Sequence, residues 1–201
     1  LLAMPDEAPA GRDYCQALRG NHNAENAAAA GLVLHCLGLN LDQINTSMAS
    51  FAGLPHRLQT VATMGPITFV NDSKATNGSA AAKAVASYSQ IYWIAGGQAK
   101  EDGLDAVIPH IRNVAKAYLI GTSAAAFAEK LRGWCHTDIY DNLYEAIHAA
   151  FDDAKENVNG GTILLAPAAA SFDQFDNFGA RGDEFCRLAK KLCGQKVKAD
   201  V

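Results

Sequence analysis

Three polar residues follow a short run of strand-forming residues at 67–70. Asp72, Lys74 and Thr76 come directly after this run, and a segment of helical composition begins at Ser79. In open α/β sheets, ligands bind at the carboxyl ends of strands, where the next helix points its positive N-terminus into the gap. A carboxylate there can accept hydrogen bonds from a sugar or hold a metal, and an ammonium group can pair with a phosphate or carboxylate. The plainer interpretation is that these residues only form a turn and a helix cap.

Two other expected strands, at 91–95 and 162–166, also end in loops of small and polar residues. Because the carboxyl ends of parallel strands share one edge, we expect the three loops to converge there. Together they would form a cationic, hydroxyl-lined pocket for a small anion such as a dicarboxylate, with aromatic rings excluding water. As separate residues, the lysines are equally typical of a solvated surface, and the phenylalanines of a core. The residues expected in the pocket are Lys74, Thr76, Lys100, Ser171, Phe172 and Phe178.

A second group of candidates includes two residues of the segment 53–57, which breaks the helical pattern. Arg57 is suited to binding phosphate, and His56 to stacking or hydrogen bonding. Asn23 and Asn26 stand near the start of an expected helix, where amides serve as caps, although they could also read the edge of a base.

Alternating periodicity beyond the break predicts repeated strand and helix units. Expected helices cover 25–37, 41–51, 79–87, 104–112, 124–131, 142–154 and 181–192, and expected strands cover 58–64, 67–70, 91–95, 117–120, 138–140 and 162–166. Short, nearly all-apolar strands favour an α/β fold, a Rossmann-like mostly parallel sheet with helices on both faces. We place a domain boundary between residues 52 and 53, with a helical segment before it.

Composition excludes several classes of protein. With 17 basic and 21 acidic residues among 201, the chain has no excess of positive charge, so we expect no nucleic-acid partner. The five cysteines show no CxxC spacing, which argues against a zinc site and favours a reducing cytoplasm. No apolar run is long enough to span a membrane. Neither GxGxxG nor GxxxxGK[ST] occurs, and the first residue is not Met, so we expect a piece of a longer chain.

Four segments, 20–27, 53–57, 71–77 and 171–175, occur in the order and spacing typical of the Mur ligases. The chain most resembles the branch of this family that adds D-glutamate. Sibling ligases carry a different, His-containing motif where this chain has Asn-Asp-Ser-Lys-Ala-Thr-Asn at 71–77.

The resemblance implies a cytoplasmic, ATP- and Mg²⁺-dependent ligase of peptidoglycan synthesis. Such an enzyme joins D-glutamate to UDP-N-acetylmuramoyl-L-alanine through an acyl phosphate, and we expect it to be a monomer. Residues 1–52 would be the end of an incomplete central ATP-binding domain, and residues 53–201 a C-terminal domain for the incoming amino acid. The Mg²⁺ ligands are expected mainly outside this chain.

Matching positions imply a role for each candidate. Lys74 and Arg57 would be catalytic. The nucleotide would be bound by Asn23, Asn26, His56, Arg57 and Asp72, and D-glutamate by Lys74, Thr76, Lys100, Ser171, Phe172 and Phe178. Two alternatives stay open: a non-catalytic Rossmann-like module that senses an acidic metabolite, and another ATP-dependent amino-acid ligase such as a folylpolyglutamate synthase relative.

Overall fold

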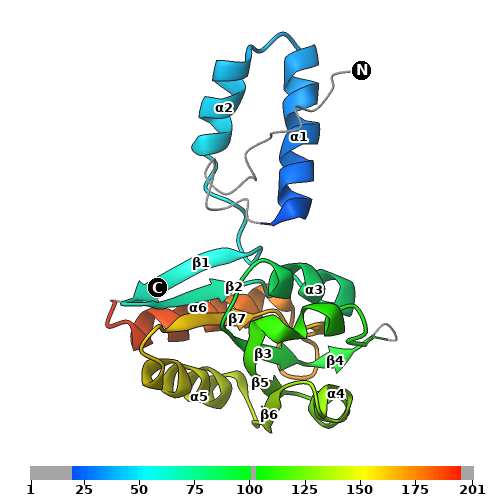
Figure 1. Ribbon diagram of the computed structural model, residues 1–201, viewed down its shortest axis with the longest axis vertical. Helices are drawn as coiled ribbons and strands as arrows, with labels where there is room; N and C mark the ends of the chain where they lie inside the picture. The colour runs from blue at the N-terminus through cyan, green and yellow to red at the C-terminus, as the bar shows by residue number, and fades with distance from the viewer. Residues whose placement is uncertain (1–19, 101–102, 196–201) are drawn as a thin grey trace. The chain divides into compact units, whose positions relative to one another are not determined.

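The computed structural model describes residues 20–100 and 103–195 (Figure 1). The chain divides into two compact units, Leu1–Leu54 and Pro55–Val201, close to the boundary expected at residue 52. Residues 1–19 of the first expected domain lie outside the described residues.

The described part of the first unit, residues 20–54, contains two helices, α1 (Asn21–Cys36) and α2 (Leu41–Ala49). Gly20 is the N-cap of α1, so Asn23 and Asn26 lie within the helix and the capping interpretation is wrong for them. Gly38 follows the end of α1 with a φ of +96°, the left-handed conformation that favours glycine after a helix. Asn40 and Gln43 form a reciprocal capping box at the start of α2.

The two helices of this unit bury little apolar surface. Ile44 is the one buried hydrophobic side chain among residues 20–54. Large apolar side chains that stay exposed are Leu32, Val33, Leu37, Leu41, Phe51 and Leu54. The unit therefore has no hydrophobic core of its own within its described residues.

The second unit is built on a six-stranded sheet with the order β1-β2-β7-β3-β5-β6. Its strands are β1 (Gln59–Met64), β2 (Ile67–Asn71), β3 (Ile91–Gly96), β5 (Val114–Ile120), β6 (His136–Ile139) and β7 (Gly161–Leu165). Within this sheet only the β1–β2 pair is antiparallel. A separate antiparallel ladder joins β4 (Gln98–Ala99) to β8 (Ala169–Ala170).

Helices cover both faces of the sheet, as the sequence predicts (Figure 1). One face packs against α3 (Gly78–Ala86), α4 (Ala124–Leu131) and the 3₁₀ helix η2 (Ile108–Asn113), and the other against α5 (Leu143–Glu156) and α6 (Phe178–Leu192). Successive strand residues alternate between the two cores, so Trp93 lies in one core while Tyr92 and Ile94 lie in the other. No helix in the described residues is long and apolar enough to cross a bilayer.

Several expected elements differ in extent. Helix α1 begins at Asn21 rather than residue 25, and β5 begins at Val114 rather than residue 117. The helix expected at 104–112 is only the 3₁₀ helix Ile108–Asn113, because Pro109 lacks an N–H donor and disfavours α-helical geometry in the residue before it. Helix α6 begins at Phe178 rather than residue 181, because the Asn177 side chain accepts a hydrogen bond from Ala180 N and caps the helix there.

Truncation of Phe69 tests the packing of α5 and α6 on the sheet. Its fully buried ring lies 5.7 Å from that of Phe151 and 6.4 Å from that of Phe185. We expect Phe69→Ala to lower the free energy of unfolding by ~3–5 kcal/mol through lost burial and a cavity. Urea denaturation followed by circular dichroism measures this change. Phe172→Ala, at a side chain that is 70% exposed, is the control and should change the value by less than about 0.5 kcal/mol.

Candidate functional site at the carboxyl edge of the sheet

Backbone hydrogen bonds join the three loops that follow β2, β3 and β7. We call them the first (72–77), second (97–100) and third (166–177) rim loops. Ala168 N donates to Ala75 O at 2.9 Å, which joins the third loop to the first. Gly96 N donates to Pro167 O at 2.8 Å, and the β4–β8 ladder joins the third loop to the second. The expected convergence is therefore present in the backbone.

The loop after β5 supports this rim from the opposite side. Ser123 N donates to Gly97 O at 2.9 Å, and Thr122 N donates to the Asp173 carboxylate at 2.9 Å. Gly97 has a φ of +132°, and a Cβ there would lie 2.2 Å from Ala170 O. Only glycine allows this close approach of the second and third rim loops.

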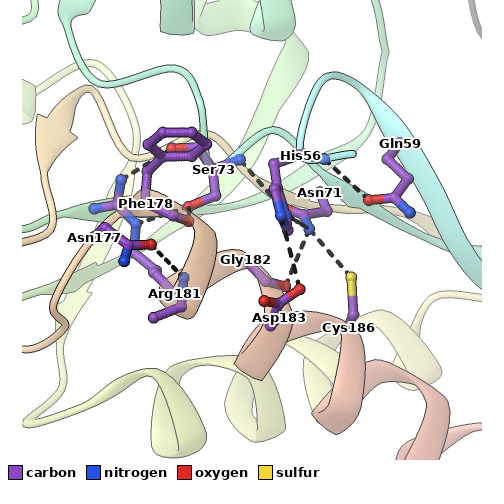
Figure 2. A network of polar contacts seen from close by, with 11 residues as sticks. His56, Gln59, Asn71, Ser73, Asn177, Phe178, Arg181, Gly182, Asp183 and Cys186 are labelled. Atoms are coloured by element: carbon purple, nitrogen blue, oxygen red, sulfur yellow. Dashed lines mark hydrogen bonds and ion pairs between the residues drawn. The ribbon is translucent and has the colours of Figure 1, made fainter. Parts of the chain in front are cut away.

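Asn71 and Ser73 form a buried polar network with α6 (Figure 2). Asn71 Nδ2 donates to Gly182 O at 3.1 Å, and Asn71 Oδ1 accepts from Ser73 N at 3.0 Å. Ser73 Oγ donates to Phe178 O at 2.7 Å. These bonds fix the backbone on both sides of Asp72 and immediately before Lys74.

His56 lies against the same network. Asn71 Nδ2 donates to its Nδ1 at 3.0 Å, which requires a proton-free Nδ1. Its Nε2 lies 3.7 Å from the Asp183 carboxylate, and its backbone oxygen accepts from Lys74 N at 3.1 Å. The residue has a φ of +60°, an uncommon conformation that these contacts hold in place.

Three of the expected site residues lie close together. The ammonium nitrogen of Lys74 is 4.1 Å from the centre of the Phe178 ring, and the rings of His56 and Phe178 meet edge to face at 6.0 Å. Lys74 is otherwise exposed, so its charge remains available to an anion at the rim.

The carboxylate of Asp72 is buried beside the turn that carries Arg57. Only 9% of Asp72 is exposed, and its Oδ1 accepts from Leu58 N at 3.2 Å. Burial raises the pKa of Asp72 from 3.8 to about 6, although the Leu58 hydrogen bond and the nearby Arg57 charge act in the opposite direction. The group is therefore mostly ionised at neutral pH. Arg57 itself is exposed.

The other expected pocket residues are spread along the rim. In the β4–β8 ladder Gln98 pairs with Ala170, so Lys100 falls near Ala168 and Ser171 falls near Gly97, at opposite ends of the ladder. Ser171 is buried, Thr76 is half-buried, and Lys100 and Phe172 are exposed. Their shared binding of one molecule stays a prediction.

Asn23 and Asn26 lie on α1 in the first unit. Asn26 is exposed, and its Nδ2 lies 3.5 Å from Asn23 Oδ1. Their expected contact with a nucleotide also stays a prediction.

The sequence interpretation missed Arg181. This side chain is only 1% exposed, and its guanidinium contacts Ser73 and Ala169. Burial lowers its pKa to about 10, while the charge of Asp173 acts in the opposite direction, so the group stays protonated at neutral pH. Its Nη1 is buried with no hydrogen-bond partner in the part of the chain that the structure describes. Such an unpaired donor costs ~1–3 kcal/mol.

A periodic signal could have revealed it. Phe185, Leu188 and Leu192 define the apolar face of α6, and Arg181 continues this spacing one turn earlier. A charged residue at a core position of an amphipathic helix indicates a buried polar contact.

The described residues contain no group of three or more His, Cys, Asp or Glu side chains that could hold a metal. A Mg²⁺ ion would need ligands beyond the carboxylate of Asp72.

Comparisons with known proteins agree with this architecture. The family model for the "Mur ligase, glutamate ligase domain" matches residues 56–169. Proteins named UDP-N-acetylmuramoylalanine--D-glutamate ligase include one from Rhizobium etli, 48% identical over 92% of this chain and 40% of its own length. Another, from Dinoroseobacter shibae, is 52% identical over 87% of this chain and 37% of its own length. The chain thus spans about two fifths of the length of these curated relatives.

Solved structures share the fold at low sequence identity. UDP-N-acetylmuramate-alanine ligase from Thermotoga maritima aligns with a TM-score of 0.63 and 14% identity, over 88% of this chain and 39% of that chain. The bifunctional folylpolyglutamate synthase/dihydrofolate synthase from Yersinia pestis aligns with a TM-score of 0.59 and 22% identity, over 82% of this chain and 39% of that chain. The family model covers more than half of the residues, and the chain therefore belongs to the Mur ligase family.

Proposed function

We propose that this chain is the C-terminal part of a cytoplasmic ATP-dependent ligase that joins D-glutamate to UDP-N-acetylmuramoyl-L-alanine in peptidoglycan synthesis. The observation that carries the proposal is the identity of 48–52% to relatives named for this activity, over 87–92% of the chain. In this proposal residues 1–52 are the end of a central ATP-binding domain, and residues 53–201 bind the incoming amino acid.

The first rim loop provides the amino-acid side of the site. Lys74 presents its ammonium group beside the Phe178 ring, where an incoming carboxylate would be partly shielded from water. Thr76 lies two residues further along the same loop and adds a neutral donor. Ser171 and Lys100, from the third and second rim loops, complete the set of residues proposed to bind the diacid.

His56, Arg57 and Asp72 provide the nucleotide side. When bound, ATP supplies the phosphoryl group that activates the carboxylate of the acceptor. The exposed guanidinium of Arg57 fits a phosphate, and the mostly ionised carboxylate of Asp72 fits a ribose hydroxyl. The half-buried ring of His56 is held in place by a hydrogen bond from Asn71.

Keeping Asp72 at this position costs stability. The unfolded carboxyl group loses its proton near pH 3.8 and the native group near pH 6, so the native state binds more protons between these values. Stability therefore falls as the pH rises through this window. Above it, the difference in pKa corresponds to ~3 kcal/mol of destabilisation.

We expect Asp72→Asn to raise the free energy of unfolding by roughly 1–3 kcal/mol at about pH 7.5, because an amide oxygen can still accept from Leu58 N without a buried charge. At about pH 4.5 the gain should be much smaller. Thermal denaturation of both proteins at the two pH values measures it, with the exposed Asp176→Asn as control. An equal gain at both pH values would show that the buried charge is not its source.

Lys74→Ala tests the amino-acid side in the full-length protein. With ATP, D-glutamate and UDP-N-acetylmuramoyl-L-alanine, we expect phosphate release to fall by about 100-fold or more, as when a group that stabilises developing charge is removed. Lys83→Ala, at an exposed lysine on α3, should stay within about twofold of the wild type. Similar rates for the two variants would remove Lys74 from the site.

Substrate selection and truncation give a further test. Full-length protein should use D-glutamate in preference to L-glutamate, whereas the 201-residue chain alone should release no phosphate, because it contains no GxxxxGK[ST] phosphate loop. A preference for L-glutamate would favour a folylpolyglutamate synthase relative. Tight binding of an acidic metabolite by the chain alone, without nucleotide, would favour a sensor module.

A further inference from the structure

Two consecutive residues at the start of α6 contact opposite sides of the rim. Resting on the proposed function, we propose that Arg181 is a positioning residue for the amino-acid side, acting through Ser73 and Ala169. The next residue, Gly182, holds the nucleotide side through His56. Helix α6 thus supports the two sides through separate contacts (Figure 2).

One guanidinium fixes two rim loops. Arg181 Nε donates to Ser73 Oγ at 3.0 Å, and Nη2 donates to Ser73 O at 3.0 Å and to Ala169 O at 3.1 Å. Lys74 directly follows Ser73, and Ser171 lies two residues after Ala169. The planar fork therefore sets the distance between the segments that carry Lys74 and Ser171, and a lysine cannot reproduce this geometry.

The second rim loop lies against the same group. A Cβ on Gly97 would lie 3.2 Å from Arg181 Nη1, the buried nitrogen that has no hydrogen-bond partner within the described residues. Two rim loops thus bond to one buried cation, and the second rim loop leaves no room for a side chain beside it. Buried polar groups are normally paired, so the charge at this position points to a role in arranging the loops.

Gly182 holds the nucleotide side in two ways: it has no side chain to collide with His56, and its carbonyl oxygen accepts a hydrogen bond from Asn71. Asn71 Nδ2 bridges Gly182 O at 3.1 Å and His56 Nδ1 at 3.0 Å. A Cβ on Gly182 would lie 2.2 Å from His56 Nδ1, so any larger residue displaces the imidazole. The position of His56 therefore depends on glycine at residue 182.

Steady-state kinetics of the full-length protein test the separation of the two sides. We expect Arg181→Lys to raise KM for D-glutamate about 10-fold or more and to lower kcat, with KM for ATP within about twofold. Gly182→Ala should show the reverse, a raised KM for ATP with little change for D-glutamate. Arg187→Lys is the matched control, because within the described residues this exposed arginine of α6 bonds only to Glu184. If Arg181→Lys changed KM for D-glutamate and KM for ATP equally, or changed neither, the proposal would be overturned.

Nuclear magnetic resonance of the 201-residue chain gives a readout independent of activity. Arg181→Lys should shift the amide signals of Ser73, Lys74 and Ala169 and leave that of His56 in place, and Arg187→Lys should shift none of them. If Arg181→Lys fails to fold, Ser73→Ala replaces it in this experiment. This variant keeps the arginine but removes the hydroxyl that accepts from Arg181 Nε, so the same loop signals should shift. Unchanged loop signals would overturn the inference, whereas an inactive wild-type enzyme with the expected shifts would overturn only the proposed function.

Discussion

The position of β7 between β2 and β3 is the constraint on which the rest of the site depends. Parallel pairing sets Asn71 level with Leu165 and Leu165 level with Ile94, so the three strands end at the same edge of the sheet. Loops that are separated by about a hundred residues in sequence therefore begin beside one another. Ligands bind at such edges because the loops diverge there and leave main-chain and side-chain polar groups available.

The rim is held together by polar contacts rather than by apolar packing. The side chains that make these contacts are buried: Asn71, Ser73 and Arg181. Their hydrogen bonds fix the loop after β2 against the loop after β7 and the first turns of α6. Directional bonds specify a geometry more narrowly than contacts between hydrocarbon groups do. A ligand site at this rim would benefit from that narrower geometry.

Local patterns were sufficient to predict the parallel sheet and the helices on its two faces, because strand length and apolar periodicity are properties of short segments. The helix expected at 104–112 shows the limit of this approach, since Pro109 limits the regular structure there to a short 3₁₀ helix. The two-residue strands β4 and β8 were not predicted, because they form only where distant loops meet.

Candidate site residues were predictable where they followed a strand directly, as Asp72 and Lys74 do. Arg181 was missed because its partners lie in other loops, and only its place on the apolar face of α6 reveals that it is buried. Asn71 was also missed, since a polar residue at a strand end gives no sign of its three-dimensional neighbours. The sequence thus identifies polar residues that directly follow a strand more readily than the buried residues that hold their loops in place.

The packing of α6 links the hydrophobic core to the site. Phe185, Leu188 and Ala189 anchor the helix against one face of the sheet, and all three are buried. Because a helix is rigid over these few residues, the core contacts also determine where Arg181 and Gly182 lie. A core substitution that shifts α6 would therefore move Ser73 and His56 together, whereas a change at Arg181 or Gly182 acts on one side alone. Substitutions in the first turn of α6 therefore change one side of the site, whereas substitutions in the core beneath α6 change both sides.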